Sequence, residues 1–268
     1  MEFLKYIILG IIQGLTEPLP VSSSGHIYLF KTIFNTNLFN SLNFEIISNF
    51  GSFIAIFIIF CKDIKKLIIS FFTYIFSTKK RKILINDFKY CLYIIISTIP
   101  VGITGLIFKD KVSSYSIKLL AISFLITAFS LFIVRNIKGH KNDNDITLKD
   151  AILIGIIQGI TIVPGISRSG TVLVGCLLCN LSRVTALKYT FMLYFPVSVA
   201  TMFVGVPDLL STTGLNTLIF PYLAGMLSAG IVTFFSYKWL SSIVKKGKLW
   251  KFSIYCIFLA FFIFIYFR

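Results

Sequence analysis

The sequence predicts an all-α membrane protein that crosses the bilayer several times, and three observations support this prediction. Hydrophobic residues make up 56% of the 268 residues, and the mean hydropathy is +0.89. Only 13% of the residues are charged, against about 25% in a soluble domain. The apolar residues gather in runs long enough to cross a bilayer as helices, with short polar segments between them. We therefore expect one membrane domain over residues 1–268.

Six apolar runs are long enough to span a membrane, while two others are interrupted. The six lie near 42–61, 87–108, 116–134, 187–207, 217–238 and 250–267. In 3–34 and 151–181 a short apolar run breaks at Gly, Pro and Ser and then resumes. Neither piece is long enough to cross, so each segment predicts a re-entrant helix-loop-helix unit. A further apolar run at 67–77, between two lysine clusters, predicts a helix lying on the membrane surface.

The basic residues orient this layout. If the first run enters from the outside and the six spans alternate, most of the 26 lysines and arginines face the cytoplasm, as the positive-inside rule requires. This distribution accounts for the net charge of +16 without a nucleic-acid partner. We expect the partners of these loops to be anionic membrane lipids.

The two interrupted segments resemble each other. "GIIQG" begins at Gly10 and again at Gly155, and each segment continues to a serine-rich turn that ends in Gly25 or Gly170. Three predicted spans separate the copies, so the copies enter from opposite sides and form an inverted-topology repeat. In such folds broken helices meet near the midplane and build a buried polar site.

The residues of the two breaks predict an anion site with an acid/base pair. Serine-rich turns at helix N-termini offer backbone N–H groups to anions, and an arginine matches phosphate oxygens two at a time. A glutamate can hold a hard divalent cation, and a histidine can carry a proton near neutral pH. The set is Gln13, Glu17, Ser22, Ser23, Ser24, Gly25 and His26, with Ser167, Arg168, Ser169 and Gly170.

Each residue also has a purely structural interpretation. A single serine in a membrane helix usually bonds its own backbone, and Glu17 or His26 alone could lie at the interface or bond a neighbouring carbonyl. Three consecutive serines mirrored by Ser-Arg-Ser favour a site instead, and an intramembrane charge such as Arg168 is a functional hypothesis by default. Glu45 is a weaker candidate that either lines the cavity or marks the interface.

The motifs "QGLTEPLPVSSSGH" and "PGISRSG" make the chain resemble the undecaprenyl-diphosphate phosphatase family, membrane enzymes of the bacitracin-resistance type. That family carries E/Q-G-x-x-E-x-x-P-x-S-S-S/T-G-H and P-G-x-S-R-S-G, and both motifs are complete here. The resemblance implies hydrolysis of undecaprenyl diphosphate to the monophosphate carrier of cell-wall synthesis. It also implies a bacterial plasma membrane location and a site open to the outer face.

The resemblance implies a role for each motif residue. Glu17 and His26 match the acid/base and metal-associated residues, Arg168 matches the diphosphate-binding arginine, and Ser23 and Ser24 match the hydroxyls beside the phosphates. Glu17 and Gln13 are the expected ligands of Mg²⁺ or Ca²⁺, and because Gln13 stands where many members have Glu, this chain has one carboxylate fewer beside the cation and departs from a paired-carboxylate role. Ser22, Gly25, Ser167, Ser169 and Gly170 complete the substrate-binding set. Two further positions depart from the family: Ser24 replaces the commoner Thr, and Cys256 stands where some members have Arg. A homodimer is compatible with this assignment.

Two questions stay open from the sequence. A polyprenyl-phosphate transporter or flippase shares the inverted-repeat architecture, although a carrier has no need of Glu and His beside an Arg-Ser phosphate cradle. The attacking group is Ser23, Ser24, or a water activated by Glu17 or His26. Ser23 is favoured because residues three apart share a helix face, which would bring it beside His26.

Overall fold

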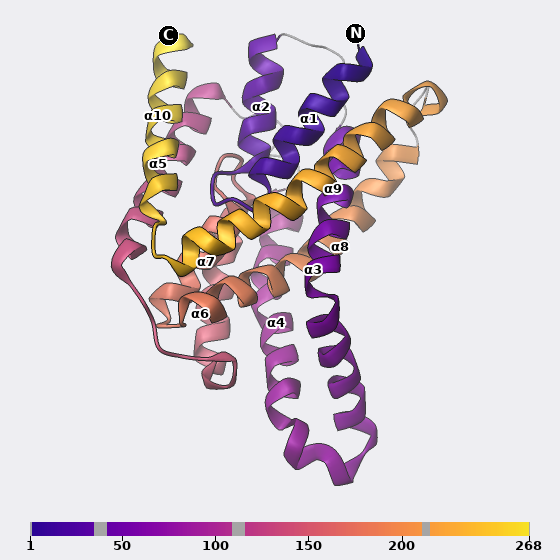
Figure 1. The fold of residues 1–268 in the computed structure, drawn as a ribbon, viewed down its shortest axis with the longest axis vertical. Coiled ribbons are helices and arrows are strands. Elements are labelled where there is room, and N and C mark those ends of the chain that lie inside the picture. The colour runs from indigo at the N-terminus through magenta and orange to yellow at the C-terminus, as the bar shows by residue number, and fades with distance from the viewer. Residues whose placement is uncertain (1, 35–41, 109–115, 211–214, 268) are drawn as a thin grey trace.

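The computed structural model describes residues 2–34, 42–108, 116–210 and 215–267, and within them the regular structure is helical. The start of α1 and the end of α10 lie at the same end of the molecule (Figure 1). The α-helices are α1 (Glu2–Thr16), α2 (Ser23–Phe34), α3 (Leu42–Phe76), α4 (Arg81–Phe108), α5 (Ile117–Ile133), α6 (Leu148–Gly159), α7 (Arg168–Leu178), α8 (Arg183–Leu210), α9 (Leu215–Lys245) and α10 (Trp250–Tyr266).

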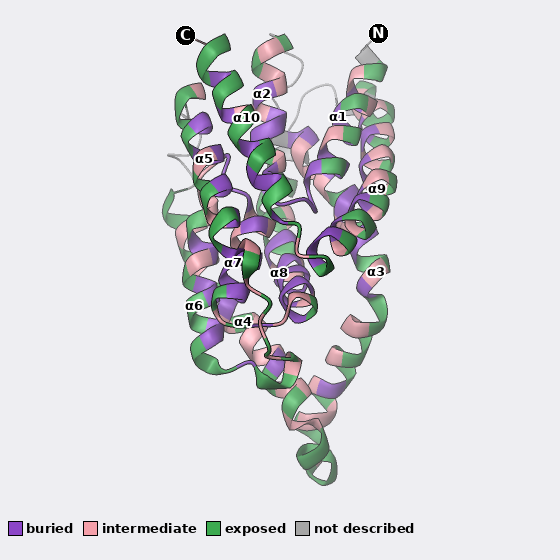
Figure 2. Cartoon of the chain, turned by 60° about the vertical axis from the view of Figure 1, so that its left-hand side comes forward, coloured by how far each residue is buried: buried purple, intermediate pink, exposed green. Residues whose placement is uncertain are grey.

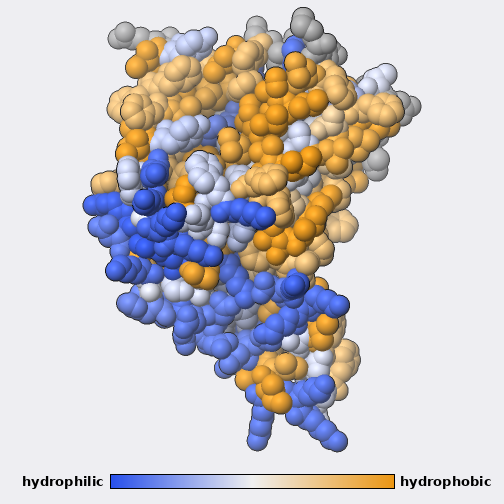
Figure 3. Space-filling model, in the orientation of Figure 1, coloured by the Kyte–Doolittle hydropathy of each residue, from blue (hydrophilic) through white to orange (hydrophobic). Residues whose placement is uncertain are grey.

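The long helices confirm a polytopic membrane protein. Within the described ranges, five helices are long and apolar enough to cross a membrane: α3, α4, α5, α8 and α9. The sixth predicted span corresponds to α10, an apolar helix of 17 residues, or about 26 Å at 1.5 Å per residue. Apolar surface covers the upper part of the molecule, whereas hydrophilic residues gather towards the lower end (Figure 3).

The two interrupted segments fold as two broken helical units. α1 and α2 flank a break at residues 17–22, and α6 and α7 flank a break at residues 160–167 that opens with the short 3-10 helix η6 (Ile160–Ile162). Both breaks fall inside the interrupted segments identified at 3–34 and 151–181. The four helices have 15, 12, 12 and 11 residues, or about 17–23 Å, which is short of a bilayer core of about 30 Å.

Small residues bring the broken units close to the long helices. α1 packs along α9, and α6 packs along α4. Gly10 lies so near α9 that an added Cβ would overlap the carbonyl of Gly225 and the hydroxyl of Ser228. Its repeat counterpart Gly155 lies against Ser97 of α4, at 2.9 Å from the position of a Cβ. The two copies therefore use the same close approach on different partners, while α5 and α10 pack on each other.

The prediction of a surface helix at 67–77 is wrong. These residues continue α3 to Phe76 without interruption, and α3 with α4 forms a hairpin that projects at the lower end of the molecule (Figure 1). Tyr74 stacks on Phe88 with ring centroids 4.0 Å apart, and the hydroxyl of Ser70 donates to Asp87 at 2.9 Å. Some side chains of this apolar run therefore pack against α4, while others remain exposed on the hairpin.

The packing of α1 on α9 predicts opposite effects of the same substitution at two helical glycines. Gly10→Ala forces a methyl group against fixed backbone, which costs about 1–3 kcal/mol of unfolding free energy. Gly102→Ala is the control, because no atom lies within 4 Å of a Cβ placed there and alanine favours helix by up to about 1 kcal/mol. Thermal unfolding in detergent should show a lower midpoint for the first variant and an equal or higher midpoint for the second. Equal loss in both would contradict the close contact.

Candidate active site

The first break turns at Ser22 and starts α2 with a side-chain cap. Ser22 has a φ of +66°, a left-handed conformation that is uncommon outside glycine and is enriched at functional sites. Its hydroxyl accepts a hydrogen bond from the backbone N–H of Gly25 at 3.3 Å, so it satisfies one of the free donors at the start of the helix. Ser24 lies beside it, with the two hydroxyl oxygens 3.5 Å apart.

The second break repeats this cap 145 residues later. Ser167 is the N-cap of α7, and its hydroxyl accepts from the N–H of Gly170 at 3.1 Å. The hydroxyls of Ser167 and Ser169 are 3.4 Å apart, as those of Ser22 and Ser24 are in the first copy. Gly165 has a φ of +89° and faces α5 so closely that an added Cβ would lie 2.7 Å from two side chains there. Only glycine fits this turn.

The two breaks touch. A Cβ on Gly25 would lie 3.2 Å from the Cα of Gly165, and one on Gly170 would lie 3.0 Å from Pro20. The hydroxyl of Ser169 donates to the carbonyl of Leu19 at 3.1 Å. Two serine-capped helix N-termini therefore meet within the helical bundle. Residues 17–22 of the first break and 165–167 of the second are buried, whereas residues 160–164 are partly buried or exposed. Figure 2 shows burial along the whole fold.

Glu17 is the centre of the hydrogen-bond cluster at this junction. Nη2 of Arg168 donates to Oε1 of Glu17 at 2.9 Å. The other carboxylate oxygen, Oε2, accepts from Nε2 of Gln13 at 3.0 Å and from the hydroxyl of Ser23. The Glu17 side chain is 6% exposed and that of Arg168 is 25% exposed. A charge buried this deeply is tolerated only when it is paired and hydrogen-bonded, and both conditions hold here.

Two residues that the sequence analysis did not identify support Arg168. Its guanidinium carbon lies 5.1 Å from the ring centroid of Tyr194 on α8, within the range of a cation–π contact. The hydroxyl of Tyr194 donates to Oδ1 of Asn49 on α3 at 3.3 Å. The arginine, the first residue of α7, is thus held by Glu17 of the first break and by Tyr194 of α8, and Asn49 of α3 in turn holds Tyr194. Neither residue carries a sequence signal, because each is one polar or aromatic residue within a long apolar helix.

His26 lies in the same helix turn as Ser23 but bonds to other groups. Its Nδ1 is 2.7 Å from the carbonyl oxygen of Ser22, and its Nε2 is 2.7 Å from the hydroxyl of Tyr255 on α10. Ser23 instead donates to Glu17. The site therefore contains two groups able to handle protons, a carboxylate joined to Ser23 and Arg168, and an imidazole joined to Tyr255.

The candidate metal ligands supply oxygen atoms of the kind that hard cations prefer. Glu17 and Gln13 are in direct contact, and with the nearby serine hydroxyls they offer carboxylate, amide and hydroxyl oxygens, which suit Mg²⁺ or Ca²⁺. In the described part of the chain, no group of three or more His, Cys, Asp and Glu residues is placed to hold a metal ion. A cation here would thus need further oxygens from outside this set.

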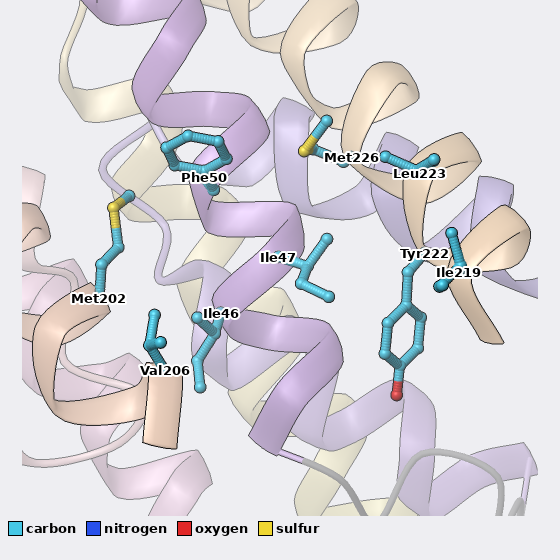
Figure 4. A pocket seen from close by; sticks show the side chains of 9 residues that line it. All are labelled: Ile46, Ile47, Phe50, Met202, Val206, Ile219, Tyr222, Leu223 and Met226. Atoms are coloured by element: carbon cyan, nitrogen blue, oxygen red, sulfur yellow. The ribbon is translucent and has the colours of Figure 1, made fainter. Parts of the chain in front are cut away.

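An apolar groove lies between α3, α8 and α9 (Figure 4). Its cavity volume is about 380 Å³. Phe50, one of its lining residues, follows Asn49, the residue that bonds Tyr194, along α3. Its lining is Ile46, Ile47, Phe50, Met202, Val206, Ile219, Tyr222, Leu223 and Met226.

Comparison with known proteins identifies the family. The family model described as bacitracin resistance protein BacA matches residues 6–262, nearly the whole chain. This chain belongs to that BacA family. The match includes the second broken unit, all of the first unit after residue 5, and every residue of the cluster around Glu17.

Curated members of the BacA family are similar to this chain over almost their full length. Undecaprenyl-diphosphatase 2 of Bacillus thuringiensis (strain Al Hakam) is 40% identical over 256 residues, which cover 95% of this chain and 94% of the relative. Undecaprenyl-diphosphatase 1 of Bacillus licheniformis is 40% identical over 262 residues, with 96% of each chain covered. The undecaprenyl-diphosphatase of Oceanobacillus iheyensis is 37% identical over 256 residues, covering 94% and 92%.

Proposed function

We propose that this protein hydrolyses undecaprenyl diphosphate to undecaprenyl phosphate and inorganic phosphate, and so recycles the lipid carrier of cell-wall synthesis. The names of its relatives support this activity. The observation that carries it is the ion pair between Glu17 and Arg168, buried in an apolar bundle between two serine-capped helix N-termini. Such an arrangement has donors for phosphate oxygens on two sides and a carboxylate at its centre.

Phosphate binding follows from the donors already in place. The N-termini of α2 and α7 carry free backbone N–H groups and the positive end of the helix dipole. Arg168 is bound to Glu17 through one nitrogen, and a phosphate oxygen competes for the same guanidinium with charge-assisted hydrogen bonds. The apolar groove between α3, α8 and α9 is our proposed binding surface for the isoprenyl chain.

Ser23 is the attacking group that the contacts favour. Its hydroxyl donates to Glu17, so the carboxylate takes the proton as the oxygen bonds to the terminal phosphorus. The bond from that phosphorus to the bridging oxygen breaks, and the lipid monophosphate leaves. Water then hydrolyses the phosphoserine: His26 takes a proton from the attacking water, and Glu17 returns its proton to the oxygen of Ser23 as inorganic phosphate leaves. In the alternative, Glu17 takes a proton from a water that attacks directly, and Ser23 only binds phosphate.

A divalent cation, Mg²⁺ or Ca²⁺, is proposed to bind with the diphosphate. Glu17 and Gln13 would hold it through their side-chain oxygens once Arg168 has turned to the phosphate. Such a cation would offset the negative charge on the phosphate oxygens. The residues of the chain keep the tasks described above: the serine turns and Arg168 orient the substrate, and Glu17 accepts the proton.

A flippase or transporter is the rival function, and the asymmetry of the cluster speaks against it. Alternating access in inverted-repeat carriers uses two matching halves around the site. Here the carboxylate occurs in one copy only, because Ile162 occupies the place that corresponds to Glu17. Chemistry at one phosphate needs no such symmetry.

We propose a layout of six crossings and two re-entrant units in the bacterial plasma membrane, with the site open to the outer face. The short α1, α2, α6 and α7 would each reach only the middle of the bilayer, where the two breaks meet. The serine turns are covered there by each other, which is the condition for irregular backbone at membrane depth. The lysine-rich hairpin of α3 and α4 would then lie on the cytoplasmic side.

Purified protein in detergent should release phosphate from undecaprenyl diphosphate, in a reaction that EDTA stops and Mg²⁺ or Ca²⁺ restores. Arg168→Lys should lower the rate at least about 100-fold, because an ammonium group cannot reproduce the planar fork. Arg135→Lys is the matched control, since Arg135 lies at the surface over Phe132 and should leave the rate unchanged. A wild type without phosphate release, or an active Arg168→Lys variant, would contradict the proposal.

Rapid acid quenching with labelled substrate should trap a phosphoserine on Ser23 in the wild type, and Ser23→Ala should lose turnover and the trapped label together. Ser24→Ala is the control for phosphate binding without attack, and it should still form the adduct. If Ser23→Ala keeps substantial turnover, the water route replaces the serine route.

Single cysteines should report the proposed topology, in a background where the five native cysteines are replaced by serine. A membrane-impermeant thiol reagent added to intact cells should label cysteine at Ser116 or Thr217. It should not label cysteine at Lys79 or Lys82, at the tip of the hairpin, until the cells are opened. The reverse pattern would place the site on the cytoplasmic face.

A further inference from the structure

We propose that Tyr255 is a positioning residue for His26 and so belongs to the reaction site, a role that rests on the proposed phosphatase function. The two residues are 229 positions apart in the sequence, and their side chains form a hydrogen bond of 2.7 Å. Their rings lie almost parallel, at 4° with centroids 5.7 Å apart. No other polar group contacts Nε2 of His26 among the described hydrogen bonds.

The contact on the other nitrogen decides which tautomer His26 adopts. The carbonyl of Ser22 can only accept a hydrogen bond, so Nδ1, at 2.7 Å, carries the proton of the neutral ring. Nε2 then has a free lone pair, and the hydroxyl of Tyr255 donates to it. The left-handed backbone at Ser22 and the hydroxyl of Tyr255 therefore hold the imidazole from two sides in one tautomer.

The position of Tyr255 is fixed by its own helix. Ser253, two residues earlier, donates its hydroxyl to the carbonyl of Ala128 on α5 at 2.7 Å. Cys256, the next residue, is fully buried in the core. Phe124 of α5 contacts the imidazole edge-on, with centroids 5.5 Å apart. The packing of α10 on α5 thus places the hydroxyl of Tyr255 beside the imidazole of His26. The same helix pair fixes the orientation of the imidazole through Phe124.

This geometry lets Tyr255 serve both protonation states of His26. When the ring is neutral, the hydroxyl donates to Nε2. When Nε2 takes a proton, the hydroxyl rotates and its oxygen accepts from the imidazolium, a charge-assisted bond that is stronger than the neutral one. Tyr255 therefore stabilises the charged ring more than the neutral ring and keeps Nε2 in place while the proton is held. The tyrosine acts on the reaction only through this nitrogen.

Tyr255→Phe removes the hydroxyl and keeps the ring, so the fold should be retained. We expect the kcat for phosphate release from undecaprenyl diphosphate to fall about 10-fold to 100-fold, the loss expected for one hydrogen bond to a charged group, while the KM changes less than about twofold. Tyr266→Phe is the matched control, because it makes the same change on the same helix, where the ring of Tyr266 packs on Phe262. That variant should keep the kcat of the wild type.

The ¹⁵N resonances of the histidine rings supply a readout that needs no turnover. The chain has only two histidines, His26 and His140, and His140→Gln leaves the His26 signals alone. In the wild type these signals should show a protonated Nδ1 and a hydrogen-bonded, unprotonated Nε2. In Tyr255→Phe the Nε2 signal should move towards that of a nitrogen without a donor, and Tyr266→Phe should leave it unchanged.

The two measurements together decide the proposal. A lower kcat with a shifted Nε2 signal supports it. An unchanged Nε2 signal in Tyr255→Phe overturns it whatever the kcat of that variant. A shifted Nε2 signal with an unchanged kcat, or an effect on the KM alone, also overturns it. If the wild type releases no phosphate, the proposed function fails, while the Nε2 signal still reports separately whether Tyr255 holds His26.

Discussion

The pair of Glu17 and Arg168 is the constraint on which the rest of the molecule depends. Each residue comes from a different broken unit, and each charge would be costly in an apolar bundle without the other. Joining them requires that the two breaks meet, and meeting also covers the irregular backbone of both. The same contact therefore neutralises the buried charge and covers the polar backbone of the two breaks. It also brings together the capped N-termini of α2 and α7.

The repeat supplies the architecture twice but the charged groups only once. Ser22 and Ser167 cap their helices in the same way, and Gly10 and Gly155 make the same close approach to a long helix. The copies differ where chemistry is needed. Ile162 corresponds to Glu17, and the side chain of Gln158, the counterpart of Gln13, is buried without a hydrogen-bond partner among the described residues. The second copy keeps the cradle and adds Arg168 at the position that corresponds to Ser23.

The sequence predicts this site well wherever the signal is local. Serine-rich turns ending in glycine predict the helix starts near Ser23 and Arg168, and the offset of 145 residues predicts that the breaks belong together. Long-range contacts leave no such signal. Tyr194 and Tyr255 are two of 12 tyrosines in a chain with 29 phenylalanines, so neither stands out until the fold brings it to Arg168 or His26. The prediction of a surface helix at 67–77 was wrong for a related reason. Hydropathy shows that this run is apolar but does not show what it packs against, which in the structure is α4.

The first turn of α2 connects the two proton-handling groups of the site. Ser23 points to Glu17 on the side of α1, while His26, three residues on, points to Tyr255 on α10. Residues three apart share a helix face only approximately, and the different partners draw them to different sides of that face. The orientation of this turn is set by Ser22, whose left-handed backbone and hydroxyl cap fix the start of the helix. Both groups are thus placed by one strained residue, so a small rotation of this turn would move the carboxylate-bound hydroxyl and the imidazole together.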